Sequence, residues 1–154
     1  MRAIALLLLA GCATEAAPTD VASPAPDPAA ACLAGANAPR ERLTDPPGVI
    51  TVRHVLVKHR DADRAPEGLE RRREAACLRA VEALEALKEG ADFDAVVARF
   101  SDEEGAASRG GMIGEIRADE VAPAFADAAF ALDVGQISHV VETPFGFHLI
   151  LRER

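Results

Sequence analysis

The sequence predicts a small domain of the α+β class over residues 49–154. A breaker cluster, Asp-Pro-Pro-Gly, occupies residues 45–48 and marks the point where folded structure should begin. After it, apolar patterns of strand and helix type follow one another in the order strand, helix, helix, strand, helix, strand, strand. The 154 residues leave room for one such domain and a tail, and no internal repeat divides them.

Four short segments rich in β-branched and apolar residues are expected to form strands. They lie at Ile50–Lys58, Met112–Ile116, Ile137–Val141 and Phe147–Arg152. The last two are separated by a turn at Thr143–Gly146. A short sheet is therefore expected.

Three segments have helical periodicity and lack internal breakers: Leu69–Lys88, Phe93–Phe100 and Pro123–Leu132. The second carries apolar residues at i, i+3, i+4 and i+7, and Asp92 precedes it as a candidate N-cap. The third begins with proline, which suits the first position of a helix. These helices are expected to pack on the faces of the sheet.

The first twelve residues have the features of an export signal. A positive start is followed by an apolar run over residues 3–10, too short to cross a bilayer as a helix. The run ends in Leu-Ala-Gly-Cys, which resembles the bacterial lipobox, and this resemblance implies cleavage after residue 11 and lipidation of Cys12. The alternative is an ordinary signal peptide cleaved after a small residue.

Residues 12–48 are rich in alanine and proline and are expected to form a flexible tether between a membrane and the domain. Export would place the chain in the cell envelope, facing the periplasm. Ala13, rather than aspartate, follows the candidate lipidation site, which favours the outer membrane. Cys32 and Cys77 then remain, and they either form a disulfide or stay as free thiols.

Charge and composition limit the partners. The formal net charge of −8 argues against binding to a nucleic-acid backbone, which needs a basic face. The chain has six phenylalanines and no tryptophan or tyrosine, so an aromatic pocket has to be built from phenylalanine.

A series of short motifs from residue 51 to residue 152 resembles the parvulin family of peptidyl-prolyl cis/trans isomerases. This resemblance implies a four-stranded, mainly antiparallel sheet with three to four helices packed around it, in the order βααβαββ. It also implies isomerase activity on proline-containing, unfolded or partly folded polypeptides, without a cofactor. The motifs are Phe100-Ser101-Asp102, Gly110-Gly111, Val121-Ala122-Pro123-Ala124-Phe125, Gly135-Gln136-Ile137-Ser138 and Thr143-Pro144-Phe145-Gly146-Phe147-His148.

The resemblance also implies roles for single residues. His54 and His148 match two histidines that face each other in the family's sheet, and Thr143 matches the hydroxyl residue beside them. An apolar pocket for the proline ring of the substrate is expected from Ile113, Val121, Phe125 and Phe145.

Two positions depart from the family pattern. Where the family has a cysteine or aspartate facing the site, this chain has Glu103, in a loop that is one residue longer. The acid at the site is therefore Asp102, Glu103 or Glu104. Met112 replaces an aspartate of the second strand, which we expect to affect the order of the loop.

Lys58 and Arg64 match basic positions of the family's phosphate-specific branch, but Asp63 replaces a third. This pattern predicts a mild preference for Glu or Asp before proline. The alternative is a solvated loop of mixed charge.

No metal site is expected, because the four histidines at 54, 59, 139 and 148 lack helical ligand spacing. Two further functions stay open. One is a non-catalytic chaperone or binding module with the parvulin fold, and the other is a structural lipoprotein that tethers partners to the envelope.

Overall fold

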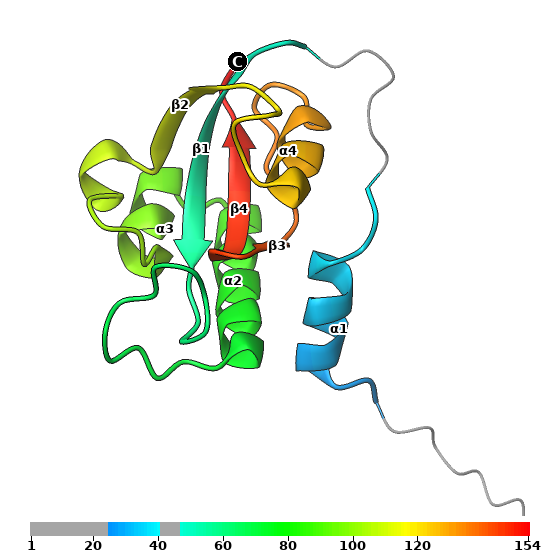
Figure 1. The fold of residues 1–154 in the computed structure, drawn as a ribbon, viewed down its shortest axis with the longest axis vertical. Coiled ribbons are helices and arrows are strands. Elements are labelled where there is room, and N and C mark those ends of the chain that lie inside the picture. Colours follow the sequence, from blue (N-terminus) through cyan, green and yellow to red (C-terminus); the bar gives the residue numbers. More distant parts are fainter. Residues whose placement is uncertain (1–24, 41–46) are drawn as a thin grey trace, which may run out of the picture.

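The computed structural model describes residues 25–40 and 47–154 and shows one sheet with helices on both of its faces (Figure 1). The expected signal peptide, residues 1–11, and the lipidation site Cys12 lie outside the described residues. No helix within the described ranges is both long and apolar enough to span a membrane.

The sheet has four strands: β1 (Ile50–Val57), β2 (Met112–Ile116), β3 (Val141–Thr143) and β4 (Gly146–Arg152). Their order across the sheet is β2-β1-β4-β3, and every neighbouring pair is antiparallel. The long strands β1 and β4 form the centre, and the prediction of a four-stranded antiparallel sheet is confirmed.

The helices of the domain are α2 (Arg73–Lys88), α3 (Phe93–Phe100) and α4 (Pro123–Phe130), with a short 3₁₀ turn, η1 (Ala107–Arg109), before β2. Helix α3 and strand β2 have the predicted bounds. Asp92 caps α3, because its Oδ1 accepts the amides of residues 94 and 95.

The sheet separates two apolar cores, one on each face (Figure 1). Helices α2 and α3 cover one face, where they pack against Val55 of β1 and Leu149 of β4. Helix α4 covers the other face, where it packs against Val52 and Ile150 of the same two strands. Side chains of even-numbered residues in β1 and β4 thus point toward α4. His54 and His148 belong to these even positions.

The prediction of a third strand at Ile137–Val141 was wrong in position. Strand β3 begins where that segment was expected to end, because the two-residue turn at Pro144 and Phe145 pairs Thr143 with Gly146. Residue 137 forms only an isolated bridge to Leu151.

Two helix ends also differ from the prediction. Helix α2 begins at Arg73 rather than Leu69, because the carbonyl of Arg71 accepts the amide of Arg60 at 2.9 Å and keeps residues 69–72 in the preceding loop. Helix α4 ends two residues early, with Ala131 as its C-cap.

The expectation of a flexible tether over residues 12–48 was wrong for residues 28–36, which form a helix. Helix α1 (Pro28–Ala36) begins with Asp27, whose side chain accepts the amide of Ala29, and with proline at its first position. Cys32 on α1 and Cys77 on α2 form a disulfide, so the pairing that the sequence left open is present. Helix α1 is therefore docked on the domain (Figure 1).

Candidate active site

Two buried imidazoles lie at the centre of the site. His54 on β1 pairs with Ile150, and His148 on β4 pairs with Leu56, so the two histidines are diagonal neighbours on the face toward α4. Their Nδ1 atoms are 3.2 Å apart, and their rings are stacked with centroids 5.4 Å apart. Both side chains are only 4% exposed.

Gly111, just before β2, allows the backbone of this segment to lie close to the backbone of His54. The amide of His54 donates to the carbonyl of Gly111 at 2.8 Å, where the ladder between β1 and β2 shifts register. Gly111 has a φ of 72°, and a Cβ there would collide with the His54 carbonyl. A residue with a side chain at position 111 would therefore push the loop before β2 away from His54.

A chain of hydrogen bonds extends from the histidines in both directions. The Oγ1 of Thr143 lies 2.7 Å from Nε2 of His148 and accepts the amide of Phe145 at 3.1 Å. At the other end, Nε2 of His54 lies 2.9 Å from Oε2 of Glu103. Arg109 donates to the same carboxylate oxygen at 2.5 Å.

The structure separates the three candidate acids of the loop. The Asp102 carboxylate accepts the amide of Lys58 and the guanidinium of Arg71, so it holds the loop that follows β1. Glu104 is exposed, and only its carbonyl is bonded to Arg109. Glu103 is therefore the acid that contacts the imidazole pair.

The protonation states of the hydrogen-bonded side chains follow from two pKa shifts. The hydrogen bond from His54 lowers the pKa of Glu103, so its carboxylate is ionised and accepts from His54. Burial lowers the pKa of His148 well below its ordinary value, and repulsion from Lys58 and from His54, whenever His54 is protonated, adds to this. His148 is therefore neutral at pH 7.

When both imidazoles are neutral, their partners Glu103 and Thr143 fix which ring nitrogens carry the protons. His54 carries its proton on Nε2, toward Glu103, and presents a lone pair at Nδ1. His148 then donates from Nδ1 to His54 and accepts at Nε2 from the hydroxyl of Thr143. The result is one directed network from the amide of Phe145 to the carboxylate of Glu103.

An open, mostly apolar pocket of about 200 Å³ lies beside this network. The ring of Phe125 forms its base and stands edge-on to His148, with centroids 5.2 Å apart. All four pocket residues expected from the sequence line it, and so do Thr143 and His148. The full lining is Ile113, Glu120, Val121, Ala122, Phe125, Thr143, Phe145 and His148.

The two basic residues of the loop after β1 lie near the pocket in different ways. Lys58 is 9% exposed, and its Nζ donates to the carbonyl of Arg64 at 2.7 Å, so it supports the loop. The guanidinium of Arg64 lies 5.7 Å from the ring centre of Phe145, at the mouth of the pocket. Arg64 therefore contacts a residue that lines the pocket.

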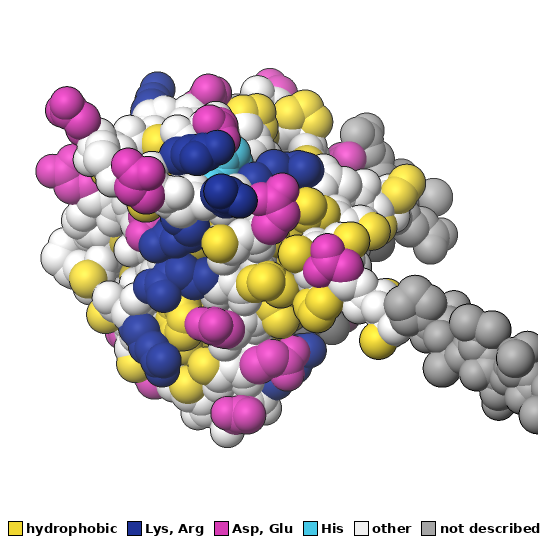
Figure 2. Space-filling model, turned by 90° about the horizontal axis from the view of Figure 1, so that it is seen from below, with side chains coloured by type: hydrophobic (Ala, Val, Ile, Leu, Met, Phe, Trp, Pro, Cys, Tyr) yellow, Lys and Arg dark blue, Asp and Glu magenta, His cyan; other side chains and the backbone are white. Residues whose placement is uncertain are grey.

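The surroundings of this loop are basic although the chain is acidic. Residues 58–73 contain six of the seventeen Lys and Arg residues of the chain but only four acids. Seen from below, Lys and Arg side chains gather in a band, with Asp and Glu side chains around it (Figure 2).

Sequence reasoning missed two residues of the site. Arg109 is the last residue of η1 and reaches Glu103 only because the loop turns back, and no local pattern predicts such a return. Glu120 lines the pocket and accepts the amide of Arg117, which ties it to the turn before α4.

The other two histidines lie apart from the pair. His59 accepts the amide of Asp61 and contacts Phe147, on the opposite face of the sheet from the pair. His139 is bonded to Arg40. Within residues 25–40 and 47–154, no group of His, Cys, Asp and Glu has the arrangement of a metal site.

Comparisons with known proteins agree with this geometry. Residues 54–154 match the family described as the PPIC-type PPIase domain. The peptidyl-prolyl cis-trans isomerase pin1 of Schizosaccharomyces pombe is 41% identical over 107 residues, which are 67% of this chain and 61% of that protein. The foldase protein PrsA 4 of Bacillus cereus is 38% identical over 71 residues, which are 46% of this chain and 25% of that protein.

The fold is found in solved structures as well. The peptidyl-prolyl isomerase ESS1 of Candida albicans superposes with a TM-score of 0.65 at 28% identity, over 73% of this chain and 66% of that chain. The chain thus spans less than two thirds of these three proteins. The resemblance to parvulins is confirmed, and the chain belongs to the family of PpiC-type peptidyl-prolyl isomerase domains.

Proposed function

We propose that this chain catalyses rotation about X-Pro peptide bonds in polypeptides, as a parvulin-type isomerase. The observation that carries the proposal is the contact between an apolar pocket and a polar network at His148, which lines the pocket and bonds to both His54 and Thr143. A proline ring fits a small apolar hollow, and the preceding carbonyl would then lie near the network.

The reaction explains why the site has this composition. Rotation breaks no covalent bond but loses amide resonance, with a barrier of about 18–20 kcal/mol. A catalyst needs to hold the ring, remove the carbonyl from bulk water and fit the twisted bond better than the planar one. Ile113, Val121 and Phe125 supply the apolar grip, and the network of fixed donors and acceptors supplies the polar surroundings.

A refolding assay separates this function from a non-catalytic chaperone. We expect substoichiometric amounts of the chain to accelerate the slow, proline-limited phase of a model protein's refolding, which takes tens to hundreds of seconds uncatalysed. A chaperone that only holds clients would slow refolding or act at equal concentration. Either of those results would favour the binding module.

The clients are proposed to be exported proteins, folding in the cell envelope beside a lipid-anchored isomerase. The lipobox-like end of the apolar run at Cys12 supports this location, as does the similarity to a protein named as a foldase. The disulfide between Cys32 and Cys77 is typical of an oxidising compartment. Metabolic labelling with palmitate in a bacterial host tests the anchor, and a Cys12→Ser variant is expected to lose the label.

A preference for Glu or Asp before proline is proposed to depend on Arg64, at the mouth of the pocket. We expect Arg64→Glu to reduce the ratio of kcat/KM for Glu-Pro over Ala-Pro peptides. Arg60→Glu is the matched control, since Arg60 is an exposed cation of the same loop that pairs with Asp61. An unchanged ratio in Arg64→Glu would favour the solvated loop instead.

A further inference from the structure

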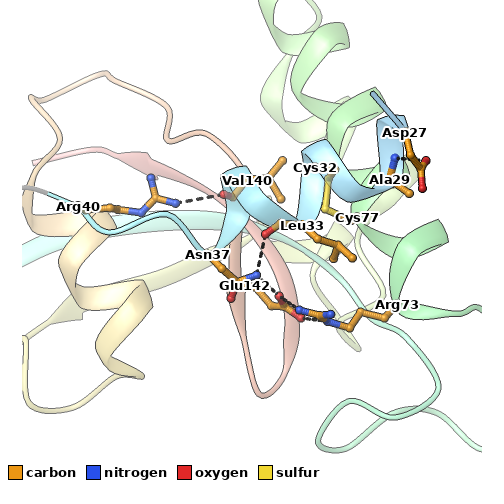
Figure 3. The surroundings of a disulfide bond; sticks show 10 residues. All are labelled: Asp27, Ala29, Cys32, Leu33, Asn37, Arg40, Arg73, Cys77, Val140 and Glu142. Atoms are coloured by element: carbon orange, nitrogen blue, oxygen red, sulfur yellow. Dashed lines mark hydrogen bonds and ion pairs between the residues drawn. A yellow bond between two sulfur atoms is a disulfide. The ribbon is translucent and has the colours of Figure 1, made fainter. Parts of the chain in front are cut away.

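Glu142 occupies the position next to Thr143 but points to the other face of the sheet. Val141 packs in the core under α4, and alternation along β3 places Thr143 on that same face. The side chain of Glu142 therefore faces α1 and α2, where its carboxylate contacts Asn37 and Arg73 (Figure 3).

Thr143 depends on a very short strand for its position. Strand β3 lies at the edge of the sheet and has three residues, and Thr143 is the last of them before the turn. Its hydroxyl nevertheless has to stay within hydrogen-bonding distance of His148, at 2.7 Å. A functional side chain needs its supports fixed to within about 0.5 Å, and three ladder positions are a weak support.

Glu142 supplies the missing support by joining three elements. Arg73, the first residue of α2, donates from Nε and Nη2 to the two carboxylate oxygens at 2.5 and 2.6 Å. Asn37, the C-cap of α1, donates from its side-chain amide to the same carboxylate and also to the carbonyl of Leu33. The Glu142 side chain is only 11% exposed, whereas its partner Arg73 is 43% exposed, so the carboxylate is held in place at the edge of a solvent-accessible contact.

Helix α1 is itself fixed by the disulfide. Cys32 lies one turn before the C-terminal end of α1, and Cys77 lies in α2, one turn after Arg73. The disulfide thus holds Asn37 beside Glu142, and covalent and hydrogen-bonded links run without a break from Cys77 to Glu142 (Figure 3). Thr143 is the next residue of the chain.

We propose that Glu142 is a positioning residue of the isomerase, and that α1 is a working part of the catalytic domain through its contact at Asn37. The inference rests on the proposed isomerase activity. Loss of the contact lets β3 shift, so that the hydroxyl of Thr143 no longer holds His148 in its tautomer. The proline pocket keeps most of its affinity, because five of its eight lining residues lie on β2, on α4 or in the segment just before α4.

The first test uses the full chain with Glu142→Gln, which keeps the shape of the side chain but removes its charge, and with Asn37→Ala. We expect kcat to fall roughly three- to tenfold in each, with KM for a proline peptide within about twofold. Lys88→Gln is the matched control, because it breaks an exposed ion pair with Glu85 on the same helix α2 and has no link to the site.

The second readout is the imidazole ¹⁵N spectrum, which reports the hydrogen bond at Nε2 of His148 directly. We expect the His148 signals to move in Glu142→Gln and in Asn37→Ala but not in Lys88→Gln. A loss of kcat that follows only the unfolded fraction, with unmoved His148 signals, would overturn the proposal. If the unmodified chain shows no isomerase activity, the proposed function fails, while the ¹⁵N signals still decide whether Glu142 positions Thr143.

Removal of the disulfide tests the role of α1. Cys32→Ser/Cys77→Ala, measured well below its melting temperature, is expected to show the same fall in kcat and the same change at His148. Reduction by a phosphine should reproduce both effects in the unmodified chain; the phosphine gives two electrons to the disulfide, and water supplies the oxygen of the phosphine oxide and the protons of the two thiols. The phosphine should have no effect on the Cys32→Ser/Cys77→Ala variant. Full activity of the unmodified chain after complete reduction of its disulfide would contradict the proposal.

Discussion

The Nε2 atom of His54 lies 2.9 Å from the Oε2 atom of Glu103, so the buried imidazole pair ends on an ionised carboxylate. Most of the network is hidden from solvent, but this end is partly exposed, since the Glu103 side chain is 31% exposed. The negative charge thus acts on the histidines from the rim of the site.

Replacement of Glu103 by glutamine is expected to lower kcat/KM. The amide cannot hold the proton of His54 in place by charge, and a partly exposed charged hydrogen bond is worth about 1 kcal/mol, or roughly fivefold in rate. The measurement is the isomerase rate on an Ala-Pro peptide. Glu104→Gln, at the exposed neighbour, serves as the control and should keep the original rate; equal effects of the two changes would show that the loop's charge acts only at a distance.

The buried His148 is expected to stay neutral on acidification. Because burial lowers its pKa in the folded state, the stabilising contribution of the neutral form is fully present above the unfolded value of 6.5 and is lost as the pH falls from there through the lower folded pKa. Ionised Glu103 also stabilises the folded state, and this contribution is lost as the pH falls from 4.5, because its pKa in the folded protein is lowered from that value.

Two measurements check this pH dependence. An NMR titration of the imidazole carbons should place the midpoint of His148 below 6.5, and urea unfolding should give a lower free energy at pH 5.5 than at pH 7.5. A midpoint of His148 at or above 6.5 would contradict the assignment of a neutral, accepting Nε2.

Ile113 and Met112 provide a matched test of the pocket. The two are neighbours on β2 with nearly equal exposure, 39% and 38%, but only Ile113 lines the hollow. Ile113→Ala is expected to lose about 1–2 kcal/mol of contact with the proline ring, or roughly five- to thirtyfold in kcat/KM, without a large loss of stability. Met112→Ala should change neither quantity much; a similar loss of kcat/KM in both variants would mean that the pocket is not the binding site.

Reduction of the Cys32–Cys77 disulfide is expected to destabilise the domain. The bond closes a loop with a sequence separation of 45, for which the loss of chain entropy in the unfolded state corresponds to about 4 kcal/mol of stabilisation. Urea unfolding with and without a phosphine reductant measures the difference, and the Cys32→Ser/Cys77→Ala variant should not respond to the reductant. No change in the unmodified chain would show that α1 adds nothing to stability.

Local pattern was enough to predict the elements whose stability is local. Helix α3 was predicted from the spacing of four apolar residues and from Asp92, and the same features are found buried and capped. Strand β2 was predicted because a glycine pair precedes it and because the family motif includes it, although its hydrogen-bonding partner is the distant strand β1.

Elements fixed by distant contacts were predicted less well. Strand β3 takes its register from the tight turn to β4. Residues 137–140 before it were predicted to be part of a strand, but within them only residue 137 forms a bridge to β4. Helix α1 carried two correct signals, Asp27 and Pro28, but its stability comes from the disulfide and from packing on α2, which an alanine- and proline-rich sequence does not reveal.

The candidate site was predictable where the family motif supplied it and not elsewhere. The motif gave both histidines, Thr143 and the four pocket residues, whereas Arg109 and Glu142 entered only with the fold. Arg109 reaches Glu103 because the loop between them turns back, and Glu142 reaches partners on two separate helices. The sequence spacing of these residues does not indicate either contact.

The most direct test of the central claim is NMR exchange spectroscopy on a short Ala-Pro peptide with a catalytic amount of the full chain. If the pocket at Phe125 holds the proline ring beside the His148 network, cis and trans signals should exchange within about a second, instead of the uncatalysed tens to hundreds of seconds. Ile113→Ala should slow this exchange while Met112→Ala does not. A peptide that binds at the pocket, as seen from shifted signals of Ile113 and Phe125, but exchanges no faster than in buffer would contradict the claim.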